Sequence, residues 1–104
     1  MAALGSKIRT LEGGRVAFMC PGCKQAHQVT VDGSRGWTFN GNGDAPTFSP
    51  SVFVNAPGPY FNPSPDVPSC HSFVTDGRIQ FLPDCTHDLA GQTVDLPDFL
   101  PATA

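Results

Sequence analysis

Cysteine and histidine, the side chains that most often bind zinc, fall into two groups along this chain of 104 residues. The first is Cys20-Pro-Gly-Cys23, whose two-residue spacing lets both sulfur atoms reach one tetrahedral ion. The second group lies much later in the sequence and consists of Cys70, His71, Cys85 and His87. One pair is only half a site, so we expect both groups to contribute to a zinc site that joins two distant segments.

The geometry of a β-strand limits which residues of the second group can bind. Successive side chains point to opposite faces, so Cys70 and His71 cannot both reach one ion from a regular strand. In that case Cys70 and Cys85 complete the site. If residues 70 and 71 lie in a bend, Cys70 and His71 complete it instead. His87 can replace the fourth ligand of either set, and the sequence leaves these alternatives open.

The polar residues exceed what one structural site needs, which suggests a metal-dependent hydrolase as an alternative. A second cluster would hold an ion or activate water, and its members would be His27, His71, Asp84 and His87. Glu12 is the only glutamate, so the H-E-x-x-H and H-x-E signatures are both absent. An aspartate would have to act as the general base.

Thiol redox chemistry at Cys20 and Cys23 is a further alternative that the local structure disfavours. Such motifs need the first cysteine at a helix N-terminus, which lowers the pKa of its thiol. The segment 24–30 is instead typical of a strand.

The elements that position these residues must be short strands and ordered loops. Eleven glycines and eleven prolines disfavour long helices, while 39% apolar residues, including eight phenylalanines, indicate a folded core. We expect strands at residues 15–20, 26–31, 37–40, 47–55, 70–75, 78–82 and 93–96. The chain is therefore predicted to be a mostly β single domain, in which antiparallel hairpins form a rolled sheet or a small sandwich clipped by zinc.

Turn residues fix the register of two hairpins. The first turns at Pro21-Gly22, and the second turns at Asp76-Gly77. A two-residue Asp-Gly turn places Ser72 opposite Phe81, which brings Cys70 opposite Pro83 and close to Cys85. Pro50 indicates an edge strand or a bulge within 47–55.

Three segments lie outside the expected sheet. They are an N-terminal arm over residues 1–14, a Pro-rich loop over 55–69 and a C-terminal tail over 99–104. The loop is too rigid for a flexible linker and offers a contact surface. Tyr60 and Phe61 at its centre either pack onto the domain or anchor a partner.

The charge distribution does not favour nucleic acid as a partner. The net charge is -3, and the basic residues of the first third form at best a small face, comprising Lys7, Arg9, Arg15, Lys24 and Arg35. No stretch approaches the roughly 20 apolar residues of a membrane helix, and residues 1–6 lack the apolar core of a signal peptide. We expect a cytoplasmic location in a bacterial cell, or a place in a virion.

A series of motifs in a fixed order makes the chain similar to a known family. They are Cys20-Pro-Gly-Cys23 with His27, Trp37, Pro46-Thr47-Phe48-Ser49-Pro50-Ser51, Cys70-His71-Ser72-Phe73, Asp76-Gly77-Arg78-Ile79-Gln80-Phe81-Leu82, and Asp84-Cys85-Thr86-His87 through Ala90-Gly91-Gln92-Thr93. Over residues 15–98 the chain resembles small phage and prophage proteins that often carry the name ammonia monooxygenase. A shorter relative resembles the zinc proteins found beside bacterial ubiquitin-like conjugation genes. Ammonia monooxygenase is a copper enzyme embedded in a membrane, so that name does not fit this sequence.

The resemblance implies a metal-binding domain of phage or prophage origin with no established reaction. A sulfur-rich site with four protein ligands leaves no open position for water, as metal catalysis requires. The predicted function is therefore a zinc-stabilised accessory or protein-binding module without catalytic activity. Its partner would be a host or phage protein.

Overall fold

The computed structural model describes residues 2–32, 36–59, 62–64 and 67–99, and these form two antiparallel sheets without a helix. The first sheet contains, in spatial order, β1 (Ala2–Leu4), β2 (Ile8–Leu11), β3 (Arg15–Cys20) and β4 (Gln25–Thr30). The second contains β5 (Thr38–Phe39), β6 (Phe48–Val54), β7 (Cys70–Thr75), β8 (Arg78–Phe81) and β9 (Thr93–Asp95). The predicted β fold is confirmed, and of the two architectures considered the chain adopts the sandwich.

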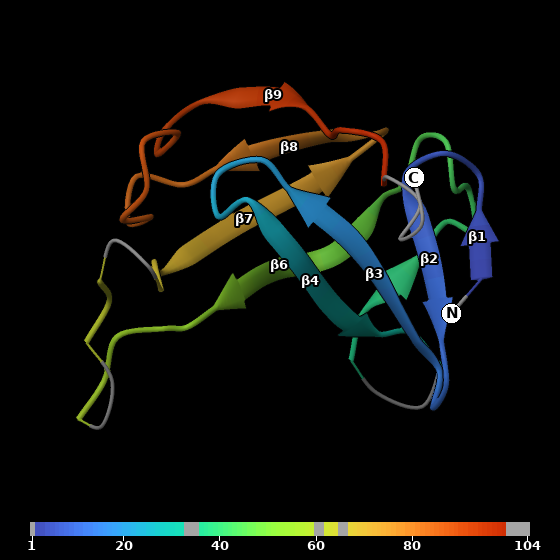
Figure 1. The fold of residues 1–104 in the computed structure, drawn as a ribbon, viewed down its shortest axis with the longest axis horizontal. Coiled ribbons are helices and arrows are strands. Elements are labelled where there is room, and N and C mark those ends of the chain that lie inside the picture. The colour runs from blue at the N-terminus through green and yellow to red at the C-terminus, as the bar shows by residue number, and fades with distance from the viewer. Residues whose placement is uncertain (1, 33–35, 60–61, 65–66, 100–104) are drawn as a thin grey trace.

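The two sheets pack against each other through alternate residues of their strands. Figure 1 shows β3 and β4 crossing β6 and β7. Phe18 of β3 is fully buried and stacks on Phe48 of β6 with the ring centroids 5.8 Å apart. Each side chain of this size contributes roughly 1.5–3 kcal/mol when it is removed from water. The core therefore holds the two sheets together.

The described residues contain no helical segment with the length and hydropathy of a membrane span.

The β7–β8 hairpin has the register that its turn predicts. Asp76 and Gly77 both have positive φ angles, 51° and 79°, as a type I′ turn requires. Ser72 then lies opposite Phe81. Along β7 the even-numbered residues are buried and the odd-numbered ones are partly or well exposed. Cys70 thus points into the sandwich, and His71 points to the outer face of the second sheet.

The expected irregularity at Pro50 is a bulge in β6. Phe48 pairs with Val74 and Val52 pairs with Ser72, so three residues of β6 lie opposite Phe73 alone. These are Ser49, Pro50 and Ser51, and the Ser49–Pro50 peptide bond is cis. Ser51 therefore lies opposite Phe73, which is two residues along β7 from His71 and on the same face of the strand.

Of the segments expected outside the sheet, the N-terminal one forms strands and the Pro-rich loop does not. The predicted N-terminal arm, residues 1–14, instead supplies β1 and β2, because Ile8 is fully buried in the core and anchors β2 beside β3. The Pro-rich loop has no strand in its described part, and the Asn55 side chain donates to the carbonyl of Pro68 (3.3 Å), which ties the ends of the loop together. Tyr60 and Phe61 lie outside the described residues.

Candidate functional site

Three sulfur atoms and one histidine ring come together where the sheets meet the later loops. Their ligand atoms all lie within 4.8 Å of one another. We call this group the Cys/His cluster, and it consists of Cys20, Cys23, Cys70 and His87. Cys20 ends β3, Cys23 follows in the turn, Cys70 begins β7 and His87 lies in the connection after β8. Both halves predicted from the sequence therefore contribute.

The separations within the Cys/His cluster suit a tetrahedral zinc ion. Zinc bound at about 2.3 Å from sulfur and about 2.0–2.1 Å from nitrogen requires about 3.8 Å between two sulfurs and about 3.6 Å between sulfur and nitrogen. The Cys20 and Cys70 sulfurs are 3.8 Å apart, and Nε2 of His87 is 3.4 Å from the sulfur of Cys70. The sulfurs are free thiols rather than disulfides. The donor set therefore fits zinc, which favours thiolate and imidazole ligands.

The thiols of the Cys/His cluster are electrostatically coupled. Hydrogen bonds from the side chains of Cys23 and Cys70 lower the pKa of Cys20 well below its usual value, and the backbone amide of Cys23 also donates to the Cys20 sulfur (3.3 Å). The hydrogen bond with Cys20 raises the pKa of Cys23 to about 12 and also raises the pKa of Cys70. One thiolate is favoured, and further negative charge is opposed until a cation balances it.

Close packing orients His87. A Cβ atom on Gly22 would lie 2.3–2.6 Å from three atoms of the His87 ring, so only glycine fits between the two cysteines at this position. The backbone amide of Leu89 donates to Nδ1 of His87 (3.2 Å). Cys23 and His87 also line a cavity of about 600 Å³, whereas Cys20 and Cys70 are fully buried. The Cys/His cluster is therefore accessible from one side only.

His71 and Cys85 lie outside the Cys/His cluster, although the sequence offered both as ligands. His71 points to the other face of β7 because residues 70 and 71 lie in a regular strand. The thiol of Cys85 is bonded instead to the backbone of His71, accepting from its N–H (3.2 Å) and donating to its carbonyl (3.1 Å). These two hydrogen bonds hold the loop that contains Cys85 against β7 at His71.

His71 connects a hydroxyl and a carboxylate on the outer face. Its Nε2 lies 2.9 Å from Oγ of Ser51, and its Nδ1 lies 3.0 Å from Oδ2 of Asp84. The carboxylate accepts a hydrogen bond from Nδ1–H, so Nε2 is left to accept the proton of the hydroxyl. Serine, histidine and aspartate in this order of contacts form the arrangement of a serine hydrolase. We call Ser51, His71 and Asp84 the triad.

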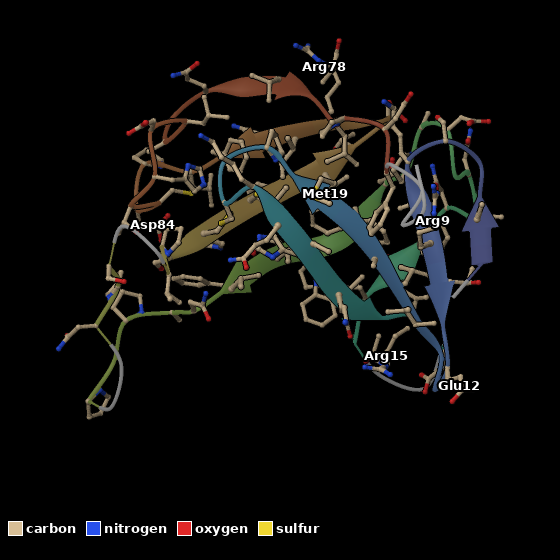
Figure 2. All side chains as sticks on the ribbon, viewed as in Figure 1. Arg9, Glu12, Arg15, Met19, Arg78 and Asp84 are labelled. Atoms are coloured by element: carbon tan, nitrogen blue, oxygen red, sulfur yellow. The ribbon has the colours of Figure 1, made fainter. Side chains whose placement is uncertain are left out.

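Aromatic residues surround the triad. The ring of Phe53 is stacked on His71 with centroids 4.3 Å apart and planes 5° apart, and Phe53 itself is 43% exposed. The indole N–H of Trp37 donates to the carbonyl of Ser51 (3.1 Å). Figure 2 shows Asp84 at the end of the sandwich where β7 begins, far from the charged residues Arg9, Glu12 and Arg15. The side chains of His71 and Asp84 are 22% and 52% exposed, so the triad is accessible from solvent on the outer face.

The cluster expected for a metal-dependent hydrolase is not assembled. His87 belongs to the Cys/His cluster, whereas His71 and Asp84 belong to the triad. His27 is buried in β4, its ring lies edge-on to Phe18, and its Nε2 has no hydrogen-bond partner in the described part of the chain. The His27 side chain contributes to lowering the pKa of Cys20, so it lies beside the Cys/His cluster.

Ser51 is the member of the triad that sequence reasoning missed. In the sequence Ser51 is part of a Pro-Ser motif, and a serine next to a proline in a strand carries no catalytic signature. His71 and Asp84 enter the sequence analysis as members of a metal-dependent hydrolase cluster, without Ser51 as their partner. The bulge at Pro50, predicted from the sequence, was the signal that could have directed attention to Ser51.

Comparison with known proteins identifies one family. The model of a family described as "Bacterial ubiquitination-like system serine protease (BubE)" matches residues 4–82. This range contains Ser51 and His71 and ends two residues before Asp84. No curated protein and no solved structure matches the chain.

Proposed function

The chain belongs to the BubE family of serine proteases from bacterial ubiquitination-like systems, and from this premise we propose that it is a serine protease with Ser51 as its nucleophile. The observation that carries the proposal is the position of His71, whose two ring nitrogens contact Ser51 (2.9 Å) and Asp84 (3.0 Å). Hydrogen bonds of this length connect nucleophile, base and orienting carboxylate in proteases of unrelated fold.

The geometry assigns a role to each residue in the first half of the reaction. Oγ of Ser51 attacks the carbonyl carbon of the substrate while its proton passes to Nε2 of His71. Asp84 keeps His71 in the tautomer that leaves Nε2 free and stabilises the imidazolium that forms. When the tetrahedral intermediate collapses, His71 donates this proton to the leaving amine, and an acyl ester on Ser51 remains.

The second half of the reaction uses the same groups with water as the nucleophile. His71 removes a proton from a water molecule that attacks the acyl ester, and it then returns the proton to Oγ of Ser51. The net reaction is hydrolysis of one amide or ester bond. Phe53, stacked on His71, restricts rotation of the ring through this cycle.

The family description supports a proposal for the substrate class. The family name places these proteases in bacterial ubiquitination-like systems, so we infer that the substrate is a protein component of such a system. The protein partner expected from the sequence is then the substrate itself. A phage or virion location stays a prediction from the sequence resemblance alone.

Zinc in the Cys/His cluster would have a structural role. Three sulfurs and one nitrogen fill all four positions of a tetrahedral ion, so the ion would supply stability rather than an activated water. The same cluster would also support the triad. Cys70 precedes His71 in β7, and Asp84 lies three residues before His87. An ion at the Cys/His cluster would therefore fix the backbone near His71, which carries the imidazole, and near Asp84, which orients it.

A fluorophosphonate probe tests the proposed nucleophile directly. The probe forms a covalent bond with an activated serine, and intact mass followed by peptide mapping identifies the modified residue. We expect one label per chain, located on Ser51. The Ser51→Ala variant should lose the label and all hydrolytic activity.

Ser49→Ala is the matched control. Ser49 lies in the same bulge, two residues from Ser51, and its side chain is exposed to solvent. This variant should be labelled at the rate of the unmodified chain. Labelling that persists in Ser51→Ala, or that maps to Ser49, would contradict the proposed mechanism.

Metal analysis tests the zinc proposal independently. Protein purified without added metal should contain one zinc per chain, and a strong chelator should abolish its cooperative thermal transition. A structural zinc site carries about 10–16 kcal/mol, which equals or exceeds the roughly 5–15 kcal/mol of net stability of a typical domain. A chain that contains no metal and melts at the same temperature with and without chelator would rule out the structural zinc.

A further inference from the structure

The strand that carries Ser51 has an open edge next to the triad. β5 pairs with β6 only through Thr38 with Ser49 and Phe39 with Phe48. Beyond the bulge, Val52, Phe53 and Val54 pair with β7 on one side. On their other side no strand of the described chain is paired with them. Among the described residues, the sheet therefore ends at β6 in this segment.

The alternation of an antiparallel ladder shows which backbone groups face that edge. Both the N–H and the C=O of His71 bond on the β8 side, to Cys85 and Leu82. The next residue, Ser72, must then direct its N–H and C=O toward β6, where it pairs with Val52. Phe53 lies between the paired residues Val52 and Val54, so its N–H and C=O point away from β7. The described backbone hydrogen bonds outside the ladders give neither group a partner.

The carbonyl of Ser51 provides independent support for this orientation. Ser51 lies two residues from Phe53, so its carbonyl should face the same edge. That carbonyl accepts a hydrogen bond from the indole N–H of Trp37 (3.1 Å), which directly precedes β5. At Ser51 the edge is thus occupied by the side chain of Trp37, and at Phe53 no described residue occupies it.

We propose that this edge binds the main chain of the substrate as an added strand, which pairs with the N–H and C=O of Phe53. The proposal rests on the proposed function and names how the substrate polypeptide is held at that site. Two residues of a strand span about 6.6–6.8 Å. A peptide paired with Phe53 therefore has its next residues alongside Ser51, where the scissile carbonyl must lie.

The side chains of this edge suit strand addition rather than protection. Proteins usually protect an exposed edge with lysine, proline or a covering loop. Val52, Phe53 and Val54 contain no charge, and Phe53 is 43% exposed on the outer face. Main-chain pairing at a sheet edge is a common means of peptide recognition, and it supplies affinity independent of the peptide sequence. The ligand class is thus an extended segment of a protein, with its reactive carbonyl at Ser51.

Peptidyl phosphonates of different length test the proposal. The probes are the diphenyl phosphonate analogues of acetyl-alanine and of acetyl-trialanine, and the readout is the second-order rate of Ser51 labelling by intact mass. We expect the longer probe to react at least tenfold faster. In an added strand only alternate amides of the trialanyl probe face the enzyme. Methylation of a peptide nitrogen that faces the enzyme should remove the rate gain, and methylation of a nitrogen that faces away should leave it.

Amide hydrogen exchange locates the contact. In the adduct with the trialanyl phosphonate, the Phe53 N–H should exchange at least tenfold more slowly than in the adduct with a fluorophosphonate, which has no peptide to pair. The Val52 N–H, which faces β7, is the internal control and should exchange equally in both adducts.

The outcomes separate this proposal from the function on which it rests. Equal labelling by the short and long phosphonates, or an unchanged Phe53 amide, overturns strand addition while fluorophosphonate labelling of Ser51 still supports the protease. Absence of Ser51 labelling by every probe overturns both.

Discussion

Cys70 and His71 are adjacent in β7 and serve two different sites. The side chain of Cys70 points inward, where its sulfur lies 3.8 Å from that of Cys20. The side chain of His71 points outward, where Nε2 lies 2.9 Å from Oγ of Ser51. The alternation of side chains along a strand produces this division. The following loop is divided in the same way, because Asp84 belongs to the triad and His87 to the Cys/His cluster. The two sites therefore depend on the same two backbone segments.

Substitution of the two neighbours should separate the sites. We expect His71→Ala to reduce hydrolysis by at least about 10³-fold, because the general base is lost, while one zinc per chain is retained. Cys70→Ala should lose the metal and the cooperative melt together. Metal analysis and circular dichroism on both variants provide the measurement. Loss of zinc from His71→Ala would show that this residue is a ligand after all.

The carboxylate of Asp84 should be essential although it is half exposed. Asp84→Asn keeps the shape of the side chain but favours the wrong tautomer of His71, and we expect kcat to fall by about 10⁴-fold with little change in the melting temperature. Asp88→Asn is the matched control, since Asp88 lies in the same loop and does not contact His71. Equal activity of the two variants would exclude Asp84 from the triad.

The stacked ring of Phe53 should affect kcat through His71. An aromatic pair contributes about 0.5–1.5 kcal/mol beyond burial, so Phe53→Ala should lower kcat by about 2- to 10-fold, and Phe53→Tyr should restore it. Phe73→Ala serves as the control because Phe73 is equally exposed, at 42%, on the same face. The measurement is kcat and KM of each variant on a small ester substrate. A rise in KM alone would contradict a positioning role.

Gly22 should be required for metal affinity. A Cβ atom at this position overlaps the ring of His87, and the ring cannot retreat without leaving the Cys/His cluster. We expect Gly22→Ala to weaken zinc binding at least tenfold in a competition titration with a chelator. Gly58→Ala should have no effect, because no atom lies within 4 Å of a Cβ built there. Equal affinities would mean that His87 is dispensable.

Zinc affinity should rise with pH. The hydrogen bond with Cys20 raises the pKa of Cys23 to about 12 and raises the pKa of Cys70, so both thiols are protonated at neutral pH. Their protons must leave when the metal binds, and affinity should increase by about two or more decades per pH unit below the thiol pKa values. Chelator competition across neutral pH measures the slope, and Cys85→Ala should leave it unchanged. A slope near zero would indicate that these thiols are not ligands.

The sequence by itself determined the local structure and the two groups of candidate metal ligands. Glycine and proline content, the Asp76-Gly77 turn and Pro50 are local signals. They predicted the β fold, the hairpin register, and an edge strand or a bulge at Pro50, where the structure has a bulge. The spacing of Cys20 and Cys23 predicted half of the Cys/His cluster for the same reason. Each of these features depends on residues close together in the chain.

Only the tertiary structure decided which distant residues meet. Three strands or loops must pack before Ser51, His71 and Asp84 come within hydrogen-bond distance, and no one of these residues carries a local signature of catalysis. The choice of His87 over His71 and Cys85 likewise depends on how the loop after β8 folds back over Gly22. A strand pattern determines the face to which a side chain points. The packing of the whole chain determines which residues that side chain contacts on that face.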